Sequence, residues 1–361
     1  MELKKIFKNC KPLFFHDSNL ILGKRDSVFL LMSDDSLKLL FKLPNVWMHR
    51  LLDRFNLYFR ARRGGVYSGT CYGEFYFLCH NRRLYSYHFP TSTLVLDKTL
   101  ERGRGPLQFS TIENITGFES GIYYGEYFEN PEMEEVHIFK RSPEGGWNRI
   151  YSFKKGTINH IHSLIPDPDA ECVWILTGDF GEAAGVWRAS DNFNTVEAVV
   201  GGEQRYRSCV AFPVGGGLLY ATDSQFETNS VRLLRKVDGC WSTEKLIDIN
   251  GPVIYGCELR DHYVFSCSSE PGEELTNTLS NLLDRQPGPG IRKNESQVIS
   301  CRKDNFMFSL VKSAEKDRYP FRLFQFGSIM FAYGVSRDNT LYAYHVATKE
   351  NDLCMERIEC H

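Results

Sequence analysis

Short apolar segments separated by turn sequences run along the whole chain. The segments are about four to eight residues long and rich in aromatic and β-branched side chains, which is typical of buried β-strands. Examples are Ser27–Met32, Glu74–Cys79, Cys172–Thr177, Gly217–Thr222, His262–Cys267 and Thr340–Val346. The sequences between them, such as PEGG, VGGG and VDG, favour tight turns. The pattern predicts an all-β fold, since only Trp47–Phe55 and Leu275–Leu283 have weak helical periodicity.

Groups of these segments recur through the middle of the chain. They open near residues 122, 160, 206 and 253, and these spacings of 38 to 47 residues match the period of a four-stranded propeller blade. The recurrence predicts one β-propeller domain over residues 1–361, with about six blades and with five or seven as the alternatives. We expect Ser328–Ile358 to complete the last blade together with an N-terminal strand, and residues 270–296 to form an inserted loop.

Charge and composition exclude several classes of protein. The 361 residues carry 43 Lys and Arg against 45 Asp and Glu, so no overall field attracts nucleic acid, and the run Arg54–Arg63 is interpreted as a solvated strand edge. No apolar run reaches the ~18–20 residues of a membrane span. The 11 cysteines form no C-x-x-C pair, which favours reduced thiols. The N-terminus lacks the apolar core of a signal peptide, so we expect a cytoplasmic protein. The oligomeric state is not indicated.

Two segments resemble Asp-box turns, whose pattern is Ser-x-Asp-x-Gly-x-Thr-Trp. Ala189–Val196 keeps the Ser, Asp and Thr, and Arg141–Trp147 keeps the Ser, Gly and Trp. The longer stretch from His160 to Asn229, with HIHSLIPDPDAECVWILTGD, QRYR and YATDSQFETN, resembles the sialidase-like propeller proteins with BNR repeats, which are described as glycosyl hydrolase-like. EPG at 270–272 and YPFRLFQFG at 319–327 add to the likeness. The resemblance implies a propeller with a glycan-related role.

The resemblance does not extend to a catalytic site. Asp-box side chains satisfy backbone groups of their own turn, so they indicate a fold and not a reaction. The arginine triad and the Tyr/Glu pair of true sialidases are not found. Classical sialidase activity is therefore not expected.

Polar residues stand where consecutive strand groups open or where their second strands end. Because strand ends and loops at one face of a propeller form its site, we expect these side chains to gather at one rim. The candidates for catalysis are His160, His162, Arg207, Asp223 and Glu126. The candidates for substrate binding are Tyr124, Asp179, Gln204, Arg205 and Glu270.

Three interpretations of these residues remain open. His160 and His162 lie two residues apart on one strand and suggest a divalent metal held with a carboxylate from Glu126, Asp179 or Asp223. Alternatively, a histidine or a carboxyl of raised pKa moves a proton while Arg207 binds a sugar carboxylate or phosphate. In the third interpretation, the polar residues only form hydrogen bonds to backbone and water.

Together these observations predict a carbohydrate-related propeller. The expected activity is that of a glycosidase or lyase on an acidic or amino sugar in bacterial surface-polysaccharide metabolism, with a glycan as the partner. The alternative is a non-catalytic scaffold for protein interactions, which propellers often are.

Overall fold

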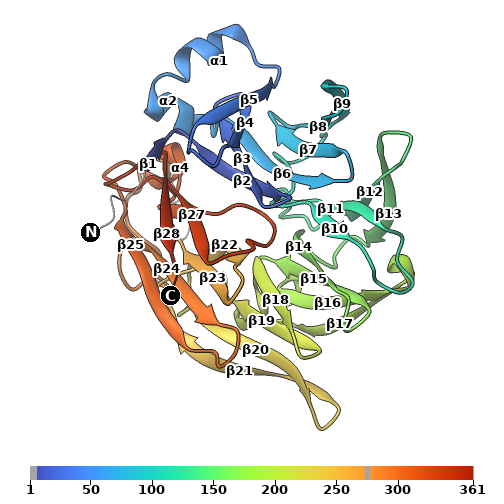
Figure 1. Cartoon of the computed structure of the whole chain (residues 1–361). Coiled ribbons are helices and arrows are strands. Elements are labelled where there is room, and N and C mark those ends of the chain that lie inside the picture. The colour runs from blue at the N-terminus through green and yellow to red at the C-terminus, as the bar shows by residue number, and fades with distance from the viewer. Residues whose placement is uncertain (1–5, 273–276, 361) are drawn as a thin grey trace. The chain divides into compact units, whose positions relative to one another are not determined.

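Seven four-stranded sheets make up most of the computed structural model, which describes residues 6–272 and 277–360. The chain is an all-β β-propeller with seven blades (Figure 1). The expected count of about six was one too low, although seven was among the alternatives. The recurrence was clear only between residues 121 and 267, and the less regular N-terminal region holds two blades.

The described residues fall into two compact units, of which the first contains three sheets. It comprises the described parts of Met1–Val66, Ser224–Asn229 and Ile249–His361. One sheet contains β2 (Lys11–His16), β3 (Asn19–Lys24), β4 (Ser27–Leu31) and β5 (Leu37–Lys42). Another contains β22 (Val253–Glu258), β23 (His262–Cys267), β24 (Glu295–Arg302) and β25 (Phe308–Glu315). The third contains β26 (Ser328–Met330), β27 (Thr340–Val346), β28 (Cys354–Glu359) and β1 (Ile6–Lys8).

The last blade joins the two ends of the chain, as predicted. β1 pairs antiparallel with β28, with Ile6 opposite Glu356 and Lys8 opposite Cys354. Buried side chains of this blade, such as Met355, pack with Leu20 and Leu22 of β3. The N-terminal strand therefore completes the sheet and contributes to the apolar layer between two blades.

The second unit comprises Tyr67–Asp223 and Ser230–Asp248 and contains most of four sheets. The first has β6 (Val66–Tyr72), β7 (Phe75–His80), β8 (Arg83–His88) and β9 (Thr93–Thr99). The second has β10 (Ser110–Ile112), β11 (Gly121–Gly125), β12 (Val136–Arg141) and β13 (Trp147–Phe153). The third has β14 (His160–Asp167), β15 (Cys172–Gly178), β16 (Gly185–Ser190) and β17 (Thr195–Gly201). The fourth has β18 (Val210–Val214), β19 (Gly217–Ala221), β20 (Ser230–Val237) and β21 (Cys240–Asp248).

The core of this unit lies between neighbouring sheets. One cluster joins the β10–β13 and β14–β17 sheets through residues such as Ile138, Phe153 and Ile175. Another places Trp174 of β15, which has no exposed surface, against Leu218 and Tyr220 of β19. Aromatic and β-branched side chains on both faces of a sheet are thus buried by the blades beside it, which is why the strands contain so few polar positions.

Short helices lie in the connections of the first unit. They are α1 (Trp47–Leu52), α2 (Asn56–Ala61), α3 (Thr278–Leu282) and α4 (Phe321–Phe324). α1 and α3 lie within the two segments of helical periodicity, and residues 275–276 of the second segment lie outside the described residues. α3 lies in the long connection between β23 and β24, the region where the sequence predicts an inserted loop over residues 270–296. The prediction for Arg54–Arg63 was wrong. The segment forms α2, and Arg60 is buried with 1% of its surface exposed.

Two expectations from composition concern the whole chain. All eleven cysteines are free, as predicted from their scattered positions. Among the described residues, no helix is both long enough and apolar enough to span a membrane. The prediction of a single domain stays a prediction.

Candidate functional site

The first strand of the β14–β17 sheet begins with two buried histidines. The pairing of β14 with β15 sets His160 opposite Gly178, and the register shifts between Ile161 and Ser163, so His162 is the extra residue of a bulge. The bulge turns the two imidazoles toward each other, with their Nε2 atoms 2.9 Å apart. Gly178 is required beside them, because a Cβ there would lie 2.2 Å from Cε1 of His162.

Asp179 completes a group that we call the His160 cluster, made of His160, His162, Asp179, Arg207 and Asp223. Oδ1 of Asp179 lies 3.3 Å from Nε2 of His160 and 3.4 Å from Nε2 of His162. The Arg207 guanidinium lies 3.0 Å from the same oxygen and 3.5 Å from Oδ2 of Asp223. Four candidate catalytic residues and one candidate binding residue therefore come together from the ends of two neighbouring blades.

Backbone carbonyls hold both imidazole rings. Nδ1 of His160 lies 3.0 Å from the carbonyl oxygen of Phe128, and Nδ1 of His162 lies 2.8 Å from that of Ser208. A carbonyl can only accept a hydrogen bond, so each Nδ1 carries a hydrogen and each neutral ring has its lone pair on Nε2. The two rings thus present acceptors toward Asp179.

Burial and charge set the ionisation of the His160 cluster. Burial lowers the pKa of His160, although the Asp179 carboxylate opposes this change. Burial also opposes ionisation of Asp179, whereas the Arg207 guanidinium favours it, and the pKa of Asp179 lies well below the usual range. Asp179 has 26% of its side chain exposed, whereas His160 and His162 have 5% and 1%. The carboxylate is therefore the part of the cluster that a ligand from solvent reaches.

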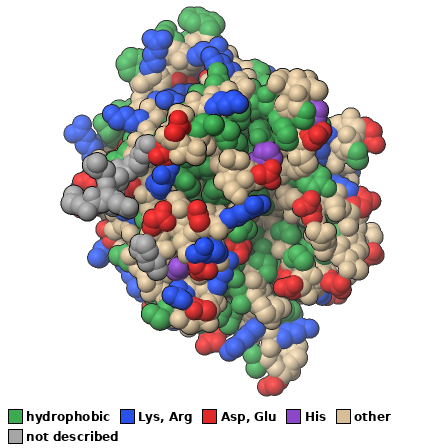
Figure 2. Space-filling view, in the orientation of Figure 1, with side chains coloured by type: hydrophobic (Ala, Val, Ile, Leu, Met, Phe, Trp, Pro, Cys, Tyr) green, Lys and Arg blue, Asp and Glu red, His purple; other side chains and the backbone are tan. Residues whose placement is uncertain are grey.

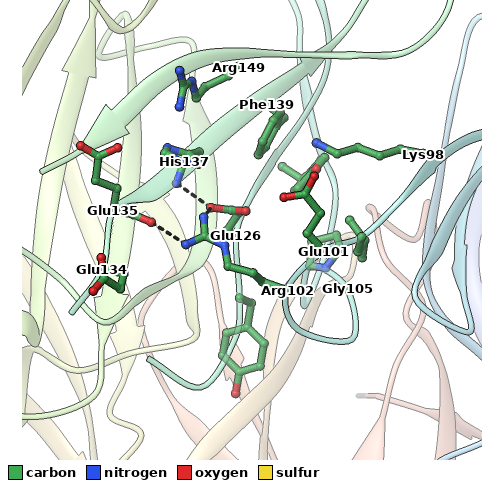
Figure 3. A pocket seen from close by; sticks show the side chains of 14 residues that line it. Lys98, Glu101, Arg102, Gly105, Glu126, Glu134, Glu135, His137, Phe139 and Arg149 are labelled. Carbon is green, nitrogen blue, oxygen red and sulfur yellow. Dashed lines mark hydrogen bonds and ion pairs between the residues drawn. The ribbon is translucent and has the colours of Figure 1, made fainter. Parts of the chain in front are cut away.

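A pocket of about 620 Å³ opens between the β6–β9 and β10–β13 sheets. Figure 3 shows side chains from both sheets and their connection pointing into it. Charged or titratable lining residues are Lys98, Glu101, Arg102, Glu126, Glu134, Glu135, His137 and Arg149. Tyr124, Tyr127 and Phe139 add aromatic walls. The ring of Tyr127 also stands edge-on to His160, with 4.5 Å between ring centres, so the pocket adjoins the His160 cluster.

The charges in this pocket are only partly matched. Glu126 forms an ion pair with Arg102 and accepts the backbone N–H of His137 at 3.0 Å (Figure 3). Within the described part of the chain, Lys98 and Arg149 have no carboxylate in ion-pair range. Nζ of Lys98 instead lies 3.4 Å from the centre of the Phe139 ring. The pocket can therefore offer two cations to an anionic ligand.

Burial shifts the acid and the base of the pocket in opposite directions. It raises the pKa of Glu126, against the effect of Arg102, and it lowers the pKa of Lys98, against the effect of Glu126. Burial raises the pKa of Tyr124 as well. Tyr124 has 2% of its surface exposed, and among the described residues its hydroxyl has no hydrogen-bond partner.

Several predicted site residues lie outside the His160 cluster. Tyr124 and Glu126 belong to the pocket. They lie on or just after β11, which is the second strand of its sheet and not the strand that opens the group, because β10 precedes it. Arg205 is exposed and pairs with Glu203 at 2.5 Å. Glu270 belongs to the first unit, where it accepts a hydrogen bond from Ser268.

Gln204 supports the cluster from its edge. Its side-chain amide donates to the backbone carbonyl of Asp179 over 2.8 Å. It thereby ties the short helix at Gln204–Tyr206 to the end of β15. Gln204 positions Asp179 and leaves the carboxylate free for its other contacts.

Sequence reasoning missed the pocket residues Lys98, Arg102, Tyr127 and Arg149. Lys98 is the last residue but one of β9, a strand without a fully buried residue, and Arg149 is an exposed residue of β13. The signal that existed was YYGEYF, in which Tyr127 follows Glu126. The approach of β9 to β12 joins segments about forty residues apart, and no spacing rule indicates it.

The comparisons with known proteins show the fold and no family. No protein-family model matches the chain, and no curated protein sequence matches it. Among solved structures, the AfRom2 CNH domain has a TM-score of 0.56 at 6% identity, covering 99% of this chain and 95% of that one. Oligogalacturonate lyase in complex with manganese has a TM-score of 0.54 at 9% identity, and the match covers 99% of this chain and 90% of that one. The β-propeller domain of Myceliophteria thermophila Cps50 (Swd1) has a TM-score of 0.53 at 8% identity, and the match covers 99% of this chain and 100% of that one. This chain is similar to all three in its β-propeller fold.

Proposed function

We propose that this protein cleaves an acidic saccharide by β-elimination in the pocket between the β6–β9 and β10–β13 sheets. One observation carries the proposal. The pocket holds a carboxyl group of raised pKa, Glu126, and an amine of lowered pKa without an ionic partner among the described residues, Lys98. Neighbouring groups whose pKa values shift in this way are typical of an acid and a base in one reaction.

The reaction assigns a role to each of these side chains. The neutral amine of Lys98 takes the proton from the carbon beside the sugar carboxylate, and the electron pair forms the carbon–carbon double bond. The bond to the glycosidic oxygen breaks, and protonated Glu126 donates its proton to that oxygen. Arg149 and Arg102 neutralise the sugar carboxylate, which makes the abstracted proton more acidic. Tyr127 provides an aromatic wall beside these groups.

The substrate class follows from the charges of the pocket. Arg149 has no ionic partner among the described residues and favours an anionic ring substituent. In a uronate, the carbon that loses the proton also bears the carboxylate. One solved structure of similar fold is named as an oligogalacturonate lyase. That name adds galacturonate oligosaccharides to the substrates worth testing. The earlier expectation of a glycosidase or lyase in surface-polysaccharide metabolism is thus narrowed to a lyase.

The test uses oligogalacturonate, alginate and glycosaminoglycan fragments with the purified full chain. We expect the ultraviolet absorbance of an unsaturated uronate to rise with one of these substrates. Glu126→Gln and Lys98→Met should each reduce kcat by ~10²-fold or more, the range of general acid–base catalysis. Glu129→Gln, at an exposed residue outside the pocket, is the matched control and should leave kcat unchanged. Hydrolysis without unsaturated product, or full activity in both variants, contradicts the proposal.

A second candidate function, a protein-interaction scaffold, rests on a separate surface. The α1 region exposes Val46, Trp47, Met48, Leu51 and Phe55, with Trp47 at 75% and Phe55 at 66%. Hydrophobic side chains are visible at the upper edge of Figure 2, where Figure 1 places α1. Contiguous exposed apolar residues are typical of interaction sites. A scaffold should lose its partner in Trp47→Glu and keep it in Glu126→Gln, whereas a lyase should show the reverse pattern for turnover.

A further inference from the structure

The His160 cluster holds more electron-pair acceptors than hydrogens to share among them. Nδ1 of each imidazole donates to a backbone carbonyl, so both neutral rings direct their Nε2 lone pairs inward. These two nitrogens are 2.9 Å apart, and the Asp179 carboxylate faces both. Three acceptors at such distances repel one another, and a shared proton or a metal ion among them relieves this repulsion.

The spacing of the three atoms fits one face of a metal coordination shell. Nε2 of His160, Nε2 of His162 and Oδ1 of Asp179 form a triangle with sides of 2.9, 3.3 and 3.4 Å. Ligands about 2.0–2.2 Å from a metal ion at near-right angles are about 3 Å apart. Two imidazoles and one carboxylate on one face form a ligand set used by divalent iron, with further positions open.

The surroundings hold this triangle in place. The carbonyls of Phe128 and Ser208 fix the ring orientations, as hydrogen-bonded partners of metal-binding histidines commonly do. Arg207 contacts Asp179 at 3.0 Å and fixes the carboxylate. Asp179 is the exposed member of the triangle, so an ion enters along its side and keeps its remaining positions toward solvent.

We propose that His160, His162 and Asp179 bind one divalent transition-metal ion, such as Mn²⁺, Fe²⁺ or Zn²⁺. Two imidazole nitrogens favour these ions over Mg²⁺ and Ca²⁺, which prefer oxygen ligands. The inference goes beyond the proposed function, because the ligands are complete without a saccharide and the pocket residues Lys98 and Glu126 take no part in the site.

The experiment measures ion binding by the full chain without any substrate. Chelator-treated protein is titrated with MnCl₂ and separately with ZnCl₂ by calorimetry, and bound metal is counted by elemental analysis after dialysis. We expect one ion per chain. His160→Ala and His162→Ala should each weaken binding by ~100-fold or more, since each removes one of three ligands. Loss of the aqueous Mn²⁺ paramagnetic resonance signal provides a second measure of binding.

Matched variants separate a specific site from other outcomes. His88→Ala removes a histidine that lies outside both the pocket and the His160 cluster and contacts Thr91, and it should leave the affinity unchanged. If the alanine variants unfold, Asp179→Asn keeps the size of a partly exposed side chain and should still lose the ion. No binding of either ion by the wild type overturns the proposal. Equal binding by wild type and Asp179→Asn overturns it as well.

Discussion

Two buried groups of charged side chains, one in each compact unit, differ in how their donors and acceptors match. Arg60 of α2 has 1% of its side chain exposed, and it contacts Asp317 at 2.5 Å and Asp352 at 3.1 Å. Its Nε also donates to the carbonyl of Phe324 over 2.9 Å. The guanidinium of Arg60 is therefore matched by two carboxylates and a carbonyl oxygen. In the His160 cluster, two ring nitrogens and a carboxylate meet with Arg207 at their edge only.

The difference separates a structural network from a binding site. A buried arginine with two carboxylates and a carbonyl is satisfied, and it fixes α2 to the segments around Asp317 and Asp352. Acceptors without a matching donor cost free energy, which is the reason that a metal ion is proposed at the His160 cluster. Burial alone does not tell a structural network from a binding site. The balance between hydrogen-bond donors and acceptors does.

The largest expected loss of stability comes from removing Arg60, the cation that is matched by carboxylates. Arg60→Met removes the ion-pair partner of the partly exposed Asp352 and leaves Asp317 with Lys316, so we expect a loss of about 3 kcal/mol in the free energy of unfolding, the lower end of the range for a broken buried pair. Urea denaturation followed by circular dichroism measures it. Arg54→Ala, at an exposed residue of the preceding turn, should be nearly neutral. An Arg60→Met protein as stable as the wild type contradicts the structural role.

A smaller and conditional effect is expected from the unmatched acceptors. If an ion binds the His160 cluster, adding MnCl₂ at about 100 times its dissociation constant should stabilise the protein by ~2.7 kcal/mol. Denaturation with and without the ion measures this difference. The gain should vanish in His162→Ala and persist in Arg60→Met. A gain that persists in His162→Ala places the ion elsewhere.

The smallest expected effect depends on pH. Burial opposes ionisation of Asp317, but Arg60 and Lys316 together hold its pKa below the usual range. A carboxyl with a lowered folded-state pKa stabilises the protein above its unfolded pKa of about 3.9, and this contribution is lost as pH falls through the folded value. Asp317→Asn should therefore be less stable than the wild type at neutral pH.

The direction of the pH effect on this stability difference can be stated, and an exposed aspartate provides the control. The stability gap between Asp317→Asn and the wild type should narrow as the pH is lowered below about 4. Asp238→Asn changes an exposed aspartate in a turn and should give no gap at either pH. A gap that widens in acid contradicts the assignment of Asp317 as the ionised partner of Arg60.

The fold was largely predictable because its cause is local. Short aromatic and β-branched segments between turns, repeated at one spacing, indicate blades without any information from distant parts of the chain. The place of the N-terminal strand in the last blade was also expected. The blade count was wrong by one because the N-terminal region, where α1 and α2 interrupt the series, hides its repeat.

The site was predictable only where the sequence places its members close together or at equivalent strand ends. His160 and His162 are two residues apart, and Asp179, Arg207 and Asp223 occupy the starts or ends of adjacent strands, so their proximity follows from blade geometry. The pairing of Arg60 with Asp317, and that of Lys98 with Phe139, joins segments whose approach no local pattern encodes.

By itself, the sequence determined an all-β propeller with polar residues at its strand ends, because side-chain alternation and turn chemistry act over a few residues. The tertiary structure decided which of those polar groups have partners. Arg60, which the sequence suggested was solvated, is buried and paired with carboxylates. His160 and His162 face each other because of a bulge in β14. Matching of donors with acceptors depends on distances of a few ångströms between segments far apart in the chain, and only the folded backbone sets those distances.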